Sequence, residues 1–227
     1  MFVEDISNDH KINEVPLSFN IIIDEINELI FKLLNKGIEW QSLEDNVIDY
    51  LNDHNIKLQE IYNWLLINQN DSNFIFLLGY INHRGVGTNV NLKKAFNLLI
   101  NASEQNHILA QYFVGNCYAY KSGTIKNEKL AFEYYEKSAK KNFSHGQSDI
   151  GYFYKNGIAI DKDYDKAFEL YMQSAEGANL GNMIAQYNLA RLYEEGEGIT
   201  KDIYKAVYWY EKSAEQGFQH AQDKLKN

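Results

Sequence analysis

The sequence repeats itself with a period of nearly 40 residues. Residues 161–171 (DKDYDKAFELY) align with residues 200–210 (TKDIYKAVYWY), and extending this alignment in both directions gives four units. The units begin near Phe74, Ala110, Gly146 and Ala185, which are 36, 36 and 39 residues apart. Such a period is typical of arrays in which each unit packs only against its neighbours. The repeat therefore limits the fold more than any other feature of the sequence.

Each unit has the pattern of two helices joined by a tight turn. A small residue that allows close helix packing occupies the middle of each first half, at Gly79, Gly115, Gly151 and Ala190. The turn then contains glycines, which tolerate positive φ, at Gly85, Gly87, Gly123, Gly157, Gly196 and Gly198. N-cap residues for the second helix follow in one register, at Asn91, Asn127, Asp163 and Asp202. An alanine comes four residues later in every unit, at Ala95, Ala131, Ala167 and Ala206.

Helical patterns also precede the repeats. Apolar residues at three- and four-residue spacings predict a long amphipathic helix over 18–36, with Gly37 as its stop. Two shorter helices are expected over 42–51 and 58–67. We interpret residues 18–71 as a helical cap on the first unit, and the alternative is that the segment 20–36 is a dimerisation or partner helix. Residues 1–17 are expected to be disordered, and 221–227 to form a short closing helix.

The repeat pattern resembles the Sel1-like repeat. The fourth unit (AQYNLARLYEEGEGITKDIYKAVYWYEKSAEQGF) carries the features of that family, and the third matches almost as well. The first two units depart from the pattern at Asn82, Lys121 and Leu130, which stand where a tyrosine, a turn glycine and a lysine belong. The resemblance implies an all-α protein, an α-solenoid of about four helical hairpins in an array over 72–227. The units lie near 74–109, 110–145, 146–184 and 185–220.

The family resemblance implies a protein-binding scaffold or adaptor with no common catalytic residue. Residues 20–66 also look like the segment that precedes Sel1 arrays in an expanded fungal family, in which a protein kinase domain often lies upstream. The sequence given contains no phosphate-binding Gly-rich loop and no catalytic-loop or Asp-Phe-Gly motif of a kinase. The alternative function is a regulatory tail associated with a protein kinase, acting in cis in relatives or in trans here.

Composition excludes several other functions. The net charge of −9 argues against binding to nucleic acid or to an anionic membrane. The single cysteine, Cys117, aligns with the core positions Ile81, Phe153 and Leu192, so we expect a buried, inert thiol. The six histidines lack metal-ligand spacing. We expect no enzyme activity, no metal and no cofactor. We also expect a cytoplasmic location, because the chain shows neither a secretory signal nor a membrane span.

A peptide or helix of a partner protein is expected to bind in the concave groove of the array. By analogy with tetratricopeptide repeats, the first helix of each unit lines this side. The positions that would face the groove are Phe76, Tyr80, His83, Tyr112, Asn116, Tyr120, Tyr152, Lys155, Tyr187, Arg191 and Glu194. Tyrosine and arginine often anchor protein interfaces, although these tyrosines could instead only pack between repeats. Glu194, Glu195 and Glu197 form an acidic cluster, which is either a solvated surface or a contact for a basic patch.

Overall fold

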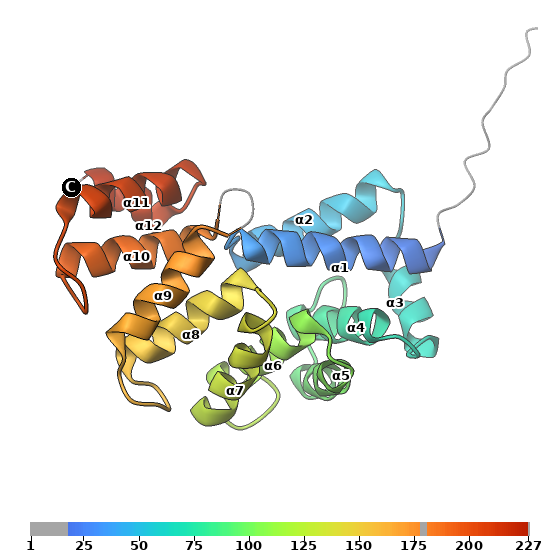
Figure 1. The fold of residues 1–227 in the computed structure, drawn as a ribbon. Helices are drawn as coiled ribbons and strands as arrows, with labels where there is room; N and C mark the ends of the chain where they lie inside the picture. The colour runs from blue at the N-terminus through green and yellow to red at the C-terminus, as the bar shows by residue number, and fades with distance from the viewer. Residues whose placement is uncertain (1–17, 178–180, 227) are drawn as a thin grey trace, which may run out of the picture.

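The computed structural model describes residues 18–177 and 181–226, and every regular element among them is a helix. The expectation of disorder over 1–17 lies outside the described residues. The described residues form twelve helices. Figure 1 shows them as a curved array with a helical segment laid across it. Their bounds are α1 Phe19–Asn35, α2 Trp40–Asp53, α3 Leu58–Ile67, α4 Ser72–Arg84, α5 Leu92–Glu104, α6 Ile108–Tyr120, α7 Glu128–Ala139, α8 Ser144–Asn156, α9 Tyr164–Ala175, α10 Met183–Glu195, α11 Ile203–Glu215 and α12 Gln219–Lys226.

The array consists of four helical hairpins. The first helices are α4, α6, α8 and α10, the second helices are α5, α7, α9 and α11, and each helix packs against those before and after it in the chain. The short helix α12 packs against α11 at the end of the array. The all-α solenoid predicted from the repeat is therefore confirmed.

The predicted N-caps are confirmed in all four units. The side-chain oxygens of Asn91, Asn127, Asp163 and Asp202 each accept a hydrogen bond from the backbone N–H three residues later, at 3.0–3.1 Å. Such a cap satisfies one of the backbone donors that the first helical turn leaves open. The alanine four residues after each cap is fully or almost fully buried in every unit, because it lies against the neighbouring helix.

The turns keep the same backbone conformation even where another residue replaces glycine. The residue that ends each first helix has a positive φ in every unit, including Lys121, whose φ is 60°. Two residues later φ is again positive, and in the third unit this position is Ala159, with a φ of 63°. The departure from the family pattern at Lys121 therefore leaves the turn geometry unchanged, at the cost of a left-handed conformation in a residue with a side chain.

The glycine in the first helix makes room for a side chain of the second helix, which is Leu99 in the first unit and an aromatic ring in the next two. A Cβ atom built at Gly115 would lie 2.6 Å from the ring of Tyr135, and one built at Gly151 would lie 2.9 Å from the ring of Tyr171. Both tyrosines are buried in the second helices. In these two units the ring packs directly against the helix backbone, and a residue with a Cβ atom would force the ring to shift.

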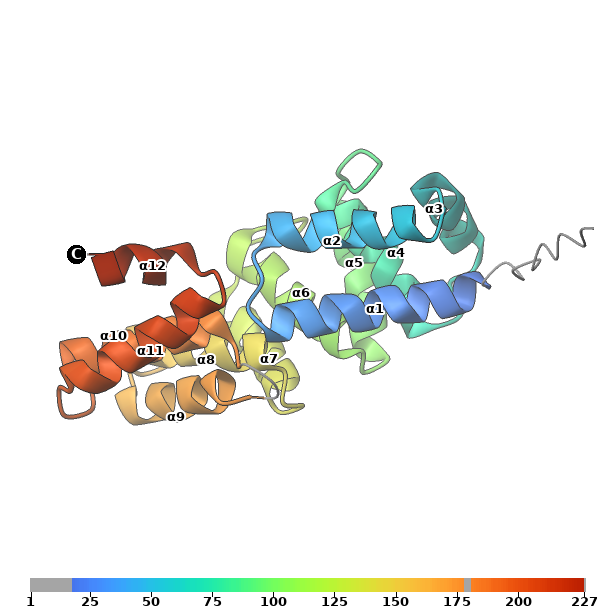
Figure 2. The same ribbon diagram turned by 90° about the horizontal axis from the view of Figure 1, so that it is seen from above.

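The helix α1 does not stay at the end of the array. It packs against α4 in the first unit and reaches α8 in the third, as Figures 1 and 2 show. Hydrogen bonds to the array fix its C-terminal end. Among them, Ser144 N–H donates to Asn35 Oδ1 at 2.8 Å, and Met183 N–H donates to the Lys36 carbonyl at 3.0 Å. The helix α3 packs against α4. Trp40 of α2 also contacts Tyr112 of α6, so the N-terminal segment is attached to the first helices of all four units.

One N-cap of the array is a histidine, which makes stability depend on pH. His107 Nδ1 accepts a hydrogen bond from Ala110 N–H at 3.1 Å, and its ring stacks on Phe76 with centroids 4.7 Å apart. Burial lowers the pKa of His107 to about 4, with opposing smaller effects from Asp71 and Lys141. In an unfolded chain the pKa of histidine is about 6.5. A protonated Nδ1 could not accept the capping hydrogen bond.

His107 contributes to the free energy of unfolding. We expect this contribution to be fully present above about pH 6.5 and to be lost as the pH falls toward 4, because only the unfolded chain takes up the proton in this range. The change amounts to about 3 kcal/mol at most. The variant His107→Asn keeps a capping oxygen, as Asn182 does at the start of α10, and does not titrate. The free energy of unfolding is measured with denaturant at pH 7.5 and at pH 4.5. It should fall by less between these two pH values in the variant than in the parent chain. Equal losses in the two proteins would contradict the assignment.

Candidate functional site

The structure buries four of the predicted partner-binding residues. Phe76, Tyr80, Tyr112 and Asn116 lie in the interior. Phe76 packs against Phe113 and His107, whereas Tyr112 lies between Phe143 and Trp40, a residue of α2. The analogy with tetratricopeptide repeats placed these residues in the groove, but contacts within the array bury Phe76 and Asn116, and α2 also covers Tyr112. In this arrangement they are packing residues that a partner cannot reach.

Two predicted residues are exposed tyrosines on the first helices. Tyr120 ends α6 and is 74% exposed, and Tyr152 lies in α8 and is 50% exposed. Burial raises the pKa of Tyr120, and the negative charges of Asp149 and Tyr152 raise it further. Tyr120 and Tyr152 therefore lie close enough to interact electrostatically. We call the surface that contains Tyr120 and Tyr152 the tyrosine face.

Three further predicted residues, Lys155, Arg191 and Glu194, form ion pairs. Lys155 pairs with Glu195 at 3.0 Å and with Glu197 at 2.8 Å, and Arg191 pairs with Glu195 at 2.7 Å. Glu194 accepts from Tyr210 at 2.8 Å and pairs with Lys224 at 3.0 Å. Burial raises the pKa of Glu195, but hydrogen bonds from Arg191 and Lys155 outweigh it and hold that pKa at about 2. The acidic cluster is therefore neutralised by cations of the same chain.

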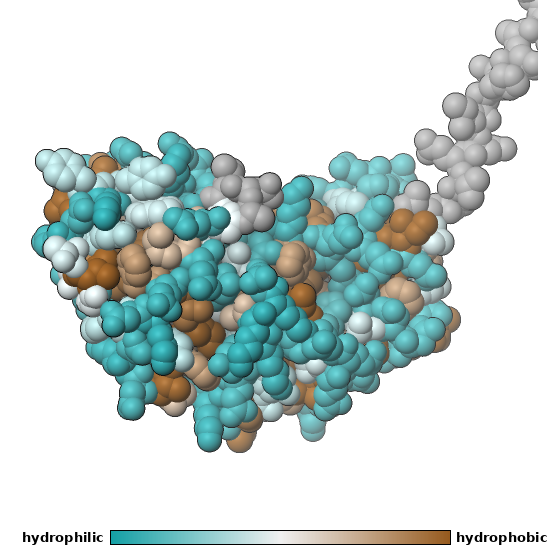
Figure 3. All heavy atoms as spheres, in the orientation of Figure 1, coloured by the Kyte–Doolittle hydropathy of each residue, from teal (hydrophilic) through white to brown (hydrophobic). Residues whose placement is uncertain are grey.

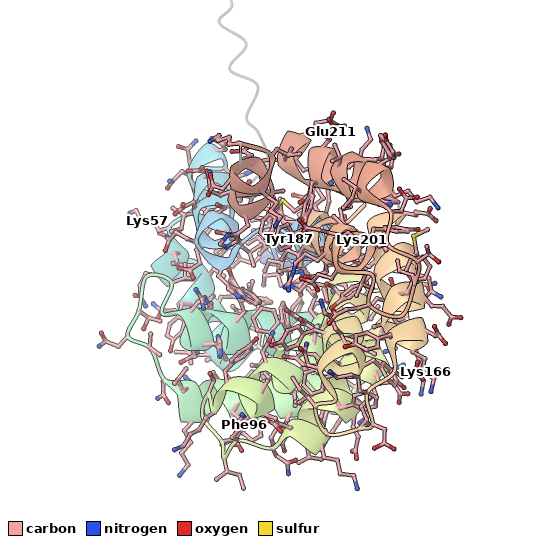
Figure 4. The ribbon with its side chains drawn as sticks, turned by 90° about the vertical axis from the view of Figure 1, so that its left-hand side faces the viewer. Lys57, Phe96, Lys166, Tyr187, Lys201 and Glu211 are labelled. Atoms are coloured by element: carbon pink, nitrogen blue, oxygen red, sulfur yellow. The ribbon has the colours of Figure 1, made fainter. Side chains whose placement is uncertain are left out.

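Tyr187 packs within the last unit. Its ring lies 5.5 Å from that of Tyr210, 5.3 Å from Phe218 and 6.3 Å from His220, measured between centroids. Figure 4 shows Tyr187 near the middle of the ring of helices, whereas Lys166 and Glu211 lie on the outside. The residue is half-buried, and its contacts hold α12 against the array.

A small pocket adjoins the tyrosine face. It has a volume of about 260 Å³ and is lined by Trp40, His83, Arg84, Asn116, Tyr120 and Ser122. The structure thus brings three predicted residues together, His83, Asn116 and Tyr120. The sequence interpretation did not include the other three, since Trp40 lies outside the repeats and the turn position of Ser122 belongs to no helix. Arg84 occupies the unit position of Tyr120, so comparing these two positions could have identified it.

Asp149 is a further residue that the sequence interpretation missed. Burial raises its pKa, and a smaller effect of His145 opposes this. Its position in the unit is occupied by Leu77 and Phe113 in the first two units, so a carboxyl group there breaks the apolar pattern. That break was the available signal for a polar group on the inner side of α8.

The described residues contain no sign of a reactive thiol. Cys117 is buried, and burial raises its pKa to about 12, as expected from its alignment with core positions. A thiol with such a pKa is protonated at neutral pH and is a poor nucleophile. No helix in the described part of the chain is long and apolar enough to cross a membrane.

A second group of exposed aromatic residues lies on the opposite side of the hairpins. Tyr204 is 90% exposed and Tyr208 is 51% exposed, both in the second helix α11. On the face shown in Figure 3, hydrophobic residues are scattered among hydrophilic ones. These two tyrosines provide an internal comparison for the tyrosine face.

Comparison with known proteins agrees with the repeat. The family model described as Sel1 repeat matches residues 73–107, 108–143, 144–179 and 184–218. A comparison with curated protein sequences found no match.

Solved structures also resemble the chain. A Sel1 repeat protein from Oxalobacter formigenes is 31% identical, with 68% of this chain and 62% of that chain covered and a TM-score of 0.59. The protective antigen c5321 of uropathogenic Escherichia coli, which displays an SLR fold, is 26% identical, with 90% and 46% covered and a TM-score of 0.65. This chain therefore spans about half to two thirds of their length. A putative Sel1 repeat protein from Klebsiella pneumoniae, 18% identical over 82% of this chain and 91% of its own with a TM-score of 0.51, shares the fold.

Proposed function

Because the chain belongs to the Sel1-repeat family, we propose that it is a non-catalytic scaffold that binds a segment of another protein on the tyrosine face. The observation that supports this most directly is the exposure of Tyr120 and Tyr152 on adjacent first helices. Tyrosine is enriched among the residues that contribute most to protein interfaces, because it offers a large apolar ring and a hydrogen-bonding tip. Two such side chains together form a suitable anchor for a peptide or a helix.

The surroundings of these tyrosines favour a rigid binding surface. The ion pairs of Lys155 join α8 to the end of α10, and the pair between Glu194 and Lys224 joins α10 to α12. The helix α1 is bonded to α8 and α10 through Asn35 and Lys36. A surface held by these contacts loses little conformational entropy when a partner binds, which favours affinity.

A capture experiment with paired variants tests the proposal. The double variant Tyr120→Ala, Tyr152→Ala removes both residues of the tyrosine face, and Tyr204→Ala, Tyr208→Ala removes two exposed tyrosines of α11. All four side chains are at least half exposed, so neither variant should change the helical circular dichroism. We expect partners captured from native extract to be lost only with the first variant. Loss only with the second, or the same partners with both, would overturn the proposal.

A further inference from the structure

Asp149 lies among tyrosine hydroxyls next to the tyrosine face. Burial raises the pKa values of four tyrosines from α6, α7 and α9, and the negative charge of Asp149 raises them further: Tyr112, Tyr120, Tyr135 and Tyr171. The hydroxyl of Tyr112 donates a hydrogen bond to the Asp149 carboxylate. The carboxyl group is therefore held in place where the second and third units meet.

This carboxylate can be reached but has no cationic partner. Asp149 is partly exposed, and neither of its carboxylate oxygens is enclosed without a partner. Among the described residues it forms no ion pair. Lys155 and Arg191 pair with Glu195 instead. A desolvated carboxylate without a counter-ion is unfavourable, and a bound cation would relieve this cost.

The exposed rings of the tyrosine face lie beside the carboxylate. Tyr152 follows Asp149 by three residues on α8, so both side chains lie on the same face of the helix. Cations bind favourably over the faces of aromatic rings, as the Lys166 ammonium does 5.1 Å from the centroid of Tyr154. No cation of the described chain lies over Tyr120 or Tyr152 in this way. A carboxylate beside two free aromatic rings suits a cationic group.

We propose that the tyrosine face receives an arginine side chain of the partner segment, whose guanidinium pairs with Asp149 beside the rings of Tyr120 and Tyr152. This inference rests on the proposed function, because it names the anchor residue of the bound segment. The planar guanidinium stacks on aromatic rings, binds carboxylates and is only weakly hydrated, so it loses little when it leaves water. The net charge of −9 also favours the approach of a basic segment. An acidic side chain would instead be repelled by Asp149.

Fragment binding tests the site without any knowledge of the partner. The probe is N-acetylargininamide, and the matched control is N-acetylcitrullinamide, which has nearly the same shape but no charge. In nuclear magnetic resonance titrations of the whole chain at pH 7, the probe should shift the ring signals of Tyr120 and Tyr152. It should bind at least about tenfold more tightly than the control, the ratio expected for charge-assisted hydrogen bonding. Equal or tighter binding of the control, or no shift of these signals, would overturn the proposal.

The variant Asp149→Asn separates binding from folding. Its amide oxygen can still accept from the Tyr112 hydroxyl, and only the charge is lost. Burial raises the pKa of Asp149, so the ionised carboxylate opposes folding at pH 7 and the variant should require at least as much denaturant to unfold. Binding of N-acetylargininamide should nevertheless weaken about tenfold. The variant Asp165→Asn removes the same charge at an exposed position of α9 and should bind the probe as the parent chain does.

The outcomes distinguish this inference from the proposed function. Unchanged binding of the probe in folded Asp149→Asn, or an equal loss in Asp165→Asn, would overturn the arginine site. Should Asp149→Asn fail to fold, Tyr120→Ala and Tyr152→Ala remove exposed rings and should each weaken binding of the probe. If partners are lost with the double variant of the tyrosine face but are kept by Asp149→Asn, the proposed function stands and the arginine site is wrong.

Discussion

Replacing Gly123 by alanine is expected to lower the free energy of unfolding by about 3 kcal/mol or more. Gly123 lies in the turn of the second unit with a φ of +76°, and a Cβ atom there would lie 2.0 Å from the carbonyl oxygen of Leu92. The carbonyl group of Leu92 belongs to the backbone, so relief of the clash requires the turn to move away from the start of α5. Chemical denaturation followed by circular dichroism measures the loss.

Gly217 provides the matched control for this substitution. Its φ is +94°, and no heavy atom lies within 4 Å of a Cβ built on it. The free energy of unfolding of the Gly217→Ala variant should therefore fall by about 1–2 kcal/mol, the cost of the left-handed backbone conformation alone. If the two variants lose the same stability, the contact between the turn and Leu92 does not hold the first two units together.

Replacing Trp40 by alanine is expected to cost about 3 kcal/mol. Trp40 lies at the start of α2, and its ring stacks on Tyr112 and meets Phe113 edge-on, with centroids 6.3 and 5.4 Å apart. The Arg84 guanidinium covers the same ring. Removal of the Trp40 side chain takes away the aromatic contacts that join α2 to the second unit. In the Trp40→Ala variant, backbone hydrogen exchange should therefore be faster than in the parent chain within α2, and the increase should be larger there than in α9.

Trp209 serves as the control for Trp40. It is also half-buried, but its ring meets Tyr208, a residue that is itself half exposed on α11. The variant Trp209→Ala is expected to lose about 1 kcal/mol and to leave the exchange of α2 unchanged. Equal losses from both tryptophans would mean that α2 is held by contacts other than Trp40.

The hairpins could be predicted because their determinants are local. The caps at Asn91, Asn127, Asp163 and Asp202 act over three residues, and the turn at each first-helix end needs one residue with positive φ. Repetition adds information, since a feature seen four times is unlikely to arise by chance. This is also why the turn keeps its geometry where Lys121 replaces glycine: the flanking helices impose it.

The course of α1 could not be predicted in the same way. Its apolar stripe is compatible with several surfaces, and what fixes it are contacts between residues over 100 positions apart, such as Asn35 with Ser144. The repeat pattern placed Tyr112 on the surface, whereas α2 covers it with Trp40. Of the predicted groove residues, Tyr120 and Tyr152 are exposed, whereas Trp40 was missing from the prediction because it lies outside the repeats.

Site-specific photocross-linking tests the central claim most directly. Benzoylphenylalanine is introduced in place of one tyrosine at a time, at Tyr120, Tyr152, Tyr204 and Tyr208, and each chain is irradiated with the partner obtained by capture. If the partner lies on the tyrosine face, cross-linked product should form from positions 120 and 152 and be nearly absent from 204 and 208. Product formed mainly from α11 would contradict the account and assign the function to the opposite side of the array.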